Sequence, residues 1–141
     1  MIDKIFLQRR IERVRGYYND LTELLAMADG MSRKIFFYYA VERVIQLIVD
    51  EVIDMNNHLI SALAFSVPDD FQSTFRVLAD NNIVSEKLAE RLAPIVGLRN
   101  RLVHRYETVD RELMLRMIGR EKEDIQDYVA VIERMVERNG D

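Results

Sequence analysis

The amino-acid sequence predicts an all-α fold, in the form of an antiparallel four-helix bundle with one additional short helix. Three observations support this prediction. Apolar residues recur at alternating spacings of three and four over long segments, and no segment of useful length alternates between apolar and polar residues. In addition, the stretch 33–65 contains neither glycine nor proline. The pattern therefore favours long helices and no strands.

The first predicted helix spans residues 3–28. Its apolar side chains form one stripe, which is typical of a helix with one face against a core. The stripe consists of Leu7, Ile11, Val14, Tyr18, Leu21 and Leu25. Gly30 is the predicted stop, and Ser32 is the predicted N-cap of the next helix.

The second predicted helix spans residues 33–65 and should be about 45 Å long. It carries one continuous apolar stripe: Tyr38, Val41, Ile45, Ile48, Val52, Met55 and Leu59. It also has a second apolar flank: Phe36, Phe37, Tyr39, Val44 and Leu47. A helix that is apolar on two sides lies in the middle of a bundle or at a subunit interface.

A short helix and two longer ones follow. Pro68 predicts a break, after which the short helix begins with Pro68 in its first turn and with Asp69 and Asp70 near its positive N-terminus. The pair Asn81-Asn82 marks a turn, and Ser85 caps the next helix. The last helix begins at residues 108–110, where Thr108 and Asp110 are the candidate caps.

Length and composition are those of a globular chain, and we expect a single domain over residues 1–141. No apolar run is long enough to span a membrane, and the N-terminus does not resemble a signal peptide. The absence of cysteine excludes disulfides, thiolate nucleophiles and cysteine-ligated metals, and it fits a cytoplasmic location. The net charge of −4 argues against a protein that coats nucleic acid, so any contact with RNA must come from a local patch.

The segment 97–106 concentrates the residues that could carry chemistry. It holds three arginines, an amide, one of the two histidines and a tyrosine: Arg99, Asn100, Arg101, His104, Arg105 and Tyr106. A fixed positive charge can stabilise the charge that builds on phosphorus, and an imidazole can move protons near neutral pH. This combination indicates phosphodiester chemistry.

The spacing Arg99-Asn100-x3-His104-x-Tyr106 resembles the signature of HEPN-domain proteins, and most closely that of the HepT toxins. The predicted order of helices matches that family over nearly the whole chain. The resemblance implies a homodimeric ribonuclease that cleaves RNA at a dimer cleft without a metal or cofactor. It also implies a partner that inhibits the enzyme, an MntA-like nucleotidyltransferase antitoxin.

The resemblance assigns a role to each residue of the motif. His104 would act as general base or general acid, and Arg99 would stabilise the phosphorane while the ribose 2′-OH forms a 2′,3′-cyclic phosphate. Asn100 would orient the histidine or the nearby backbone. Arg101 and Arg105 would hold flanking phosphates.

Tyr106 has a separate expected role, because a phenol is too weak an acid to serve as a base near pH 7. In HepT relatives the equivalent tyrosine receives AMP from the partner enzyme. The resemblance alone therefore predicts AMPylation of Tyr106, which would place bulky anions where the substrate phosphate has to bind.

Helix geometry leaves two arrangements open for Arg99 and His104. Five residues of ideal α-helix separate their directions by about 140°. Either the helix ends near Leu102–His104 and the chain turns, or two copies of the motif meet across a dimer. A purely structural alternative also remains, in which His104 favours a helix C-terminus and the arginines pair with acids such as Glu107 or Asp110. A further alternative is a non-catalytic HEPN subunit that binds nucleotide or substrate for a nucleotidyltransferase.

Other polar clusters favour structural roles. His58 is expected to be a satisfied or half-exposed helical histidine. The N-terminal basic residues are expected to form a solvated face, with an RNA- or partner-binding stripe as the alternative; they are Lys4, Arg9, Arg10, Arg13 and Arg15. The acids Asp50, Glu51 and Asp54 lack the Glu-x-x-His partner that a di-metal site requires.

Overall fold

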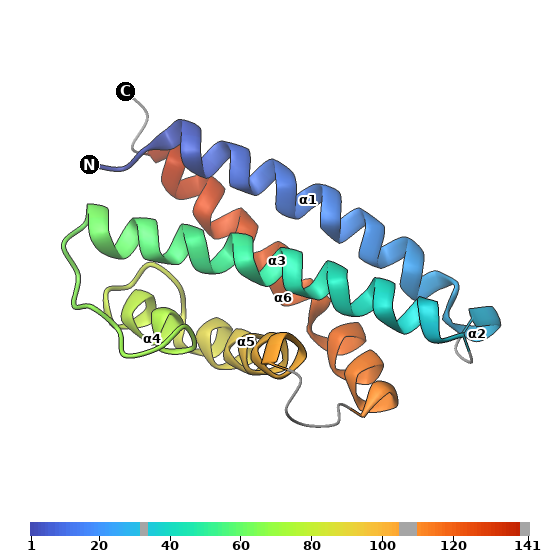
Figure 1. Cartoon of the computed structure of the whole chain (residues 1–141). Coiled ribbons are helices and arrows are strands. Elements are labelled where there is room, and N and C mark those ends of the chain that lie inside the picture. The colour runs from blue at the N-terminus through green and yellow to red at the C-terminus, as the bar shows by residue number, and fades with distance from the viewer. Residues whose placement is uncertain (32–33, 105–109, 139–141) are drawn as a thin grey trace.

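The structure is a computed structural model that describes residues 1–31, 34–104 and 110–138, and in these residues it contains six α-helices and no strand (Figure 1). The helices are α1 (Lys4–Ala26), α2 (Ala28–Met31), α3 (Ile35–Ala62), α4 (Ser73–Asp80), α5 (Glu86–His104) and α6 (Arg111–Arg138). The all-α fold is therefore confirmed. None of the helices within the described ranges is both long and apolar enough to cross a membrane.

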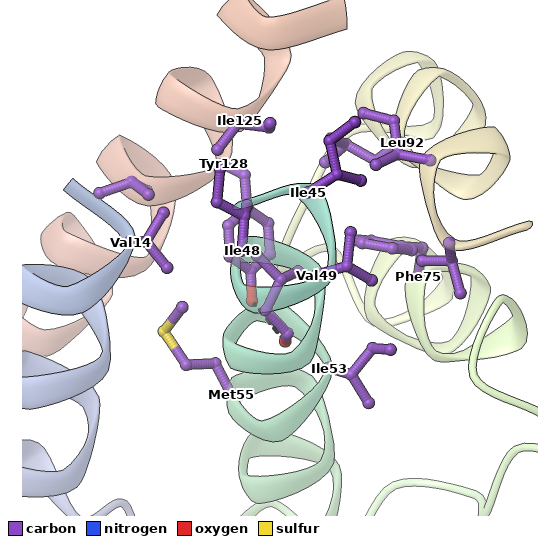
Figure 2. Packing of buried hydrophobic residues seen from close by; sticks show 14 of the residues in the cluster. Val14, Ile45, Ile48, Val49, Ile53, Met55, Phe75, Leu92, Ile125 and Tyr128 are labelled. Carbon is purple, nitrogen blue, oxygen red and sulfur yellow. Dashed lines mark hydrogen bonds between the residues drawn. The ribbon is translucent and has the colours of Figure 1, made fainter. Parts of the chain in front are cut away.

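Helix α3 lies at the centre of the molecule and packs against α1, α4 and α5. Half of its 28 residues are buried. Figure 2 shows its side chains between Val14 of α1 and Tyr128 of α6 on one side and Phe75 of α4 and Leu92 of α5 on the other. The prediction of a helix in the middle of a bundle is confirmed.

The contacts between helices show how the chain runs. The N-terminal amino group of Met1 donates to the carbonyl of Ala62, at the far end of α3, so α1 and α3 are antiparallel. An ion pair of 2.7 Å between Arg15 and Glu133 joins the second half of α1 to α6 near its end. Figure 1 shows α1 and α3 side by side, with α6 crossing behind them.

Two helix caps agree with the sequence. The Ser85 hydroxyl accepts the Leu88 amide at 3.1 Å, and the Asp110 carboxylate accepts the Leu113 amide at 3.1 Å. Both bonds satisfy amides that have no partner within the helix. The candidate caps Ser32 and Thr108 lie outside the described residues.

Two local predictions are wrong. Gly30 does not stop the first helix, because α1 already ends at Ala26 and Gly30 lies within the four-residue helix α2, which raises the number of helices from five to six. Pro68 is not in a first turn either. The chain after α3 stays irregular until Ser73, whose amide donates to the Asp70 carboxylate at 2.7 Å. The Asp70 carboxylate thus accepts the first amide of α4, and hydrogen bonds from the side chain and the backbone of Ser73 hold the pKa of this carboxyl below the usual value.

A chain of buried hydrogen bonds joins α6, α3 and α4. The Tyr128 hydroxyl donates to the Asn56 side-chain oxygen, and the Asn56 amide donates to the Thr74 hydroxyl at 3.0 Å. The Thr74 hydroxyl in turn donates to the carbonyl of Phe71 at 2.7 Å. Burial raises the pKa of Tyr128, so its hydroxyl stays protonated and remains a donor. This chain of hydrogen bonds therefore fixes the loop that carries Phe71 relative to α3 and α6.

A second polar contact joins α5 to α6. The buried Asp124 carboxylate lies 3.3 Å from Nε of Arg91. Burial raises the pKa of Asp124, and the neighbouring carboxyl of Glu121 raises it further, although Arg91 acts in the opposite direction. Protonation of Asp124 is therefore easier in the folded protein than in the unfolded chain.

We predict that Tyr128→Phe lowers the free energy of unfolding by about 1–3 kcal/mol, because it leaves the buried Asn56 oxygen without its donor. Urea unfolding measures the change. Tyr17→Phe is the matched control, since the hydroxyl of Tyr17 has no hydrogen-bond partner among the described residues. Equal losses in the two variants would contradict a structural role for the hydrogen-bond chain.

We predict that Asp124→Asn becomes more favourable relative to the wild type as the pH rises from about 4 to 7. Because the folded-state pKa of Asp124 is raised, its protonated form stabilises the fold at low pH, and that stabilisation is lost as the pH rises through the folded-state value. Urea unfolding at several pH values measures the difference. Asp127→Asn, at an exposed position on the same helix, is the control. A difference that stays constant with pH, or falls, would contradict the prediction.

Candidate active site

Arg99 lies on the side of α5 that faces α3, and Asp50 of α3 holds its guanidinium. One oxygen of Asp50, Oδ1, accepts from Nε of Arg99 at 2.8 Å and lies 2.8 Å from Nη2. The Arg99 side chain is only 17% exposed, whereas that of Asp50 is 45% exposed. A charge-assisted contact of this kind, partly shielded from water, fixes the guanidinium plane.

Two other groups complete the surroundings of the Arg99 guanidinium. Its Nη1 donates to the side-chain oxygen of Asn100 at 3.1 Å. The ring of Phe71 lies 5.8 Å from Cζ of Arg99, within the range of a cation–π contact. The motif residues Arg99 and Asn100 are thus in direct contact, and two groups from outside the motif help to orient the arginine.

The loop that carries Phe71 is attached to α5 as well as to α3. The side-chain amide of Gln72 donates to the carbonyl of Ala93 at 3.0 Å. A Cβ atom at Gly97 would lie 3.1 Å from Nε2 of Gln72, so the absence of a side chain at Gly97 permits this close approach. Gly97, two residues before Arg99, therefore helps to place Phe71 beside the guanidinium.

The structure describes the remaining motif residues only in part. Helix α5 is described as far as His104, but the side chain of His104 is outside the described part of the molecule. Arg105 and Tyr106 also lie outside the described residues. Arg101 is exposed, and no described residue forms an ion pair or hydrogen bond with it.

Because α5 includes both Arg99 and His104, the two residues occupy helix positions about 140° apart. A single continuous helix does not direct both residues to one point. Both arrangements that the sequence left open, a turn after the helix and a second copy of the motif, are compatible with this geometry.

The structural alternative is correct that an acid pairs with Arg99, and this acid is Asp50. Glu107 lies outside the described residues. No sequence signal selects Asp50 for this contact, because Asp50 is 49 positions from Arg99 and stands beside Glu51 and close to Asp54. The contact of Phe71 with Arg99 was not predicted either, because Phe71 is also far from Arg99 in the sequence. No group of three or more potential metal ligands occurs in the described residues.

The other polar clusters have largely structural contacts. Nε2 of His58 accepts the amide of Asp3 at 2.9 Å, which confirms a satisfied helical histidine. In the N-terminal basic cluster, Arg10 lies 2.7 Å from Glu51, and Arg13 and Arg15 also form ion pairs. Much of the cluster therefore joins α1 to α3 and α6.

The aromatic run 36–39 divides between core and surface. Phe37 and Tyr38 are buried, whereas Phe36 and Tyr39 are exposed at 58% and 49%. The core prediction is confirmed for the first two residues. The exposed pair keeps the prediction of a dimer interface open.

Comparison with known proteins places this chain in a family. Residues 7–132 match the family described as ribonuclease HepT-like. The mRNA nuclease HepT of Shewanella oneidensis is 25% identical over 137 residues, which cover 94% of this chain and 96% of that protein. The tRNA nuclease HepT of Aphanizomenon flos-aquae is 32% identical over 111 residues, which cover 77% of this chain and 75% of that protein.

The fold is shared with a solved structure. It is that of a tri-AMPylated HEPN toxin from Shewanella oneidensis in complex with an MNT antitoxin, with a TM-score of 0.87 and 22% identity. The similarity covers 95% of this chain and 99% of that one. Since the family match extends over most of the sequence, the chain belongs to the HepT-like ribonuclease family.

Proposed function

We propose that this protein is a cytoplasmic, metal-independent RNA endonuclease, the toxin of a pair whose antitoxin is an MntA-like nucleotidyltransferase. The observation that carries the proposal is the state of Arg99. Its guanidinium is held in a fixed plane by Asp50 and Asn100, and Arg99 is the arginine of the spacing Arg99-Asn100-x3-His104-x-Tyr106. A preorganised cation costs no reorganisation when charge develops on a phosphorane.

The proposed reaction is an internal transfer at phosphorus. The oxygen of the ribose 2′-OH forms a bond to the adjacent phosphorus, and the bond from phosphorus to the 5′ oxygen breaks, with its electron pair remaining on that oxygen. His104 of one copy takes the proton of the 2′-OH, and His104 of the other copy gives a proton to the leaving oxygen. The products are a 2′,3′-cyclic phosphate and a 5′-OH. Arg99 stabilises the negative charge of the phosphorane between these two proton transfers.

A homodimer supplies the two histidines in this scheme. Two copies offer two histidines and two arginines, so the groups that reach the phosphate need not all come from one helix, on which Arg99 and His104 lie about 140° apart. Arg101, exposed and without a described partner, is available to hold a flanking phosphate, and Arg105 is proposed for the same role. Such local contacts suit a protein with a net charge of −4.

The proposed partner and modification rest on the relatives. The similar HEPN toxin of Shewanella oneidensis is tri-AMPylated and is bound to an MNT antitoxin. We propose the same arrangement here, with Tyr106 as the acceptor. AMP groups at that position would repel the substrate phosphate and also block it sterically.

We predict that Arg99→Ala and His104→Ala each reduce RNA cleavage by at least about 100-fold and leave the thermal melting temperature nearly unchanged. The reason is that both groups act on the transition state, and the Asp50 carboxylate left behind by Arg99→Ala is partly solvated. Formation of cyclic-phosphate ends on total bacterial RNA measures the rate. Arg134→Ala, at an exposed position of α6, is the control.

Wild-type rates in both Arg99→Ala and His104→Ala would contradict the catalytic assignment. A wild-type protein that binds RNA or nucleotide saturably without cleaving it would favour the non-catalytic HEPN subunit instead. These two outcomes are separated by assaying binding and cleavage on the same preparation.

We predict that co-expression with an MntA-like nucleotidyltransferase adds the mass of one or more AMP groups to this chain. Intact-protein mass spectrometry measures the addition, and Tyr106→Phe should abolish it because the acceptor hydroxyl is gone. Tyr39→Phe, which removes the hydroxyl of an exposed tyrosine on α3, is the control. AMP mass retained in Tyr106→Phe would show that the acceptor is a different residue.

A further inference from the structure

We propose that Asp50 is a positioning residue for catalysis, one that sets the orientation of the Arg99 guanidinium. The inference rests on the proposed function and extends it to a residue outside the motif. Asp50 comes from α3, whereas the motif lies on α5, and its Oδ1 contacts both Nε and Nη2 of Arg99 at 2.8 Å.

The hydrogen bonds of Arg99 determine which donors are left for a substrate. A guanidinium has five N–H donors in a rigid planar fork. Asp50 occupies the edge formed by Nε and Nη2, and Asn100 accepts from Nη1. Nη1 and Nη2 each retain one N–H, and two donors in one plane suit two oxygens of a phosphate. Asp50 thereby selects which donors of Arg99 the phosphate meets.

Asp50 is the only carboxylate of its cluster with this contact in the described residues. Glu51, one position later, pairs with Arg10 and Arg13 of α1. Asp54, one turn later, lies 3.0 Å from Arg10. The neighbouring acids therefore join α3 to α1, whereas Asp50 alone joins α3 to the motif helix.

The exposure of the pair indicates that Asp50 orients the arginine without fully cancelling its charge. The Asp50 side chain is 45% exposed, so water screens much of its field, whereas Arg99 is only 17% exposed. Cζ of Arg99 also lies 5.8 Å from the centroid of the Phe71 ring, which limits the space into which the guanidinium can turn. Loss of Asp50 should therefore leave the positive charge of Arg99 in place but allow its guanidinium to turn away from the phosphorus of the substrate.

A positioning role predicts that Asp50→Ala lowers the rate of cleavage without weakening the binding of nucleic acid. Asp50→Ala should lower kcat for cleavage of total bacterial RNA by about 10- to 100-fold, because a misplaced catalytic group loses most of its effect. Binding of a single-stranded DNA oligonucleotide, which lacks the attacking 2′-OH, should be unchanged or tighter, since a carboxylate near the phosphate is removed. Asp50→Asn keeps an acceptor and should recover part of the rate. Asp54→Asn, one turn along α3, is the matched control and should keep wild-type kcat.

A second measurement does not depend on cleavage. In an NMR spectrum of the ¹⁵N-labelled protein, the Nε–H signal of Arg99, assigned by its absence in Arg99→Lys, should exchange slowly with water. It should exchange faster in Asp50→Ala and stay unchanged in Asp54→Asn, because only the first change removes its acceptor.

The outcomes separate the two proposals. If the wild type does not cleave RNA, the proposed function fails, and the NMR result still decides whether Asp50 orients Arg99. If the wild type cleaves and Asp50→Ala has the same kcat, Asp50 is not a positioning residue, whatever the NMR result. Parallel losses of kcat, DNA binding and melting temperature would reduce Asp50 to a purely structural role and would also overturn the inference.

Discussion

The position of α3 is the constraint on which the rest of the structure depends. A helix buried on several sides must satisfy every polar group that it carries, because an unpaired group in the interior costs about 1–3 kcal/mol. Asn56 is fully buried on α3, and it bonds to Tyr128 of α6 and to Thr74 of α4. These directional bonds allow few relative positions of the three helices, whereas apolar packing alone would tolerate many. The apolar core supplies most of the stability, and the buried chain of hydrogen bonds determines how the three helices are positioned relative to one another.

That geometry extends to the candidate site through one short loop. The bond from Thr74 to the carbonyl of Phe71 ties the loop to the core, and Gln72 ties the same loop to α5. Arg99 then lies between the Phe71 ring and the Asp50 carboxylate. Each of these groups is held by an element outside the motif helix. In the proposed site, the motif therefore supplies the reactive groups, and α3 and the loop before α4 determine the orientation of the arginine.

Periodicity predicted the helices because burial requires apolar residues at a helical spacing, and α3 satisfies that requirement along its whole length. It could not predict α2, which has no buried residue and so leaves no periodic signal. The sequence motif identified Arg99 and Asn100 as site residues, and their side chains are in contact because the two residues are adjacent in the chain. The Asp50–Arg99 contact joins residues 49 positions apart. Nothing local distinguishes Asp50 from Asp54, and only the packing of α3 on α5 selects between them.

The contact between Asp50 and Arg99 also bears on how an acidic protein could bind RNA. A fully exposed arginine attracts any phosphate, and much of nonspecific RNA binding comes from such charges. Here Arg99 is mostly buried and already has an anionic partner, so its attraction at a distance is weak. In the proposed site, a phosphate would gain most from Arg99 only when it meets the two remaining donors in their plane. Arg99 would then add little to the capture of RNA and much to the transition state, where charge on the phosphorane oxygens increases. An arginine held in this way favours catalysis over binding, which explains why the net charge of −4 does not argue against a ribonuclease.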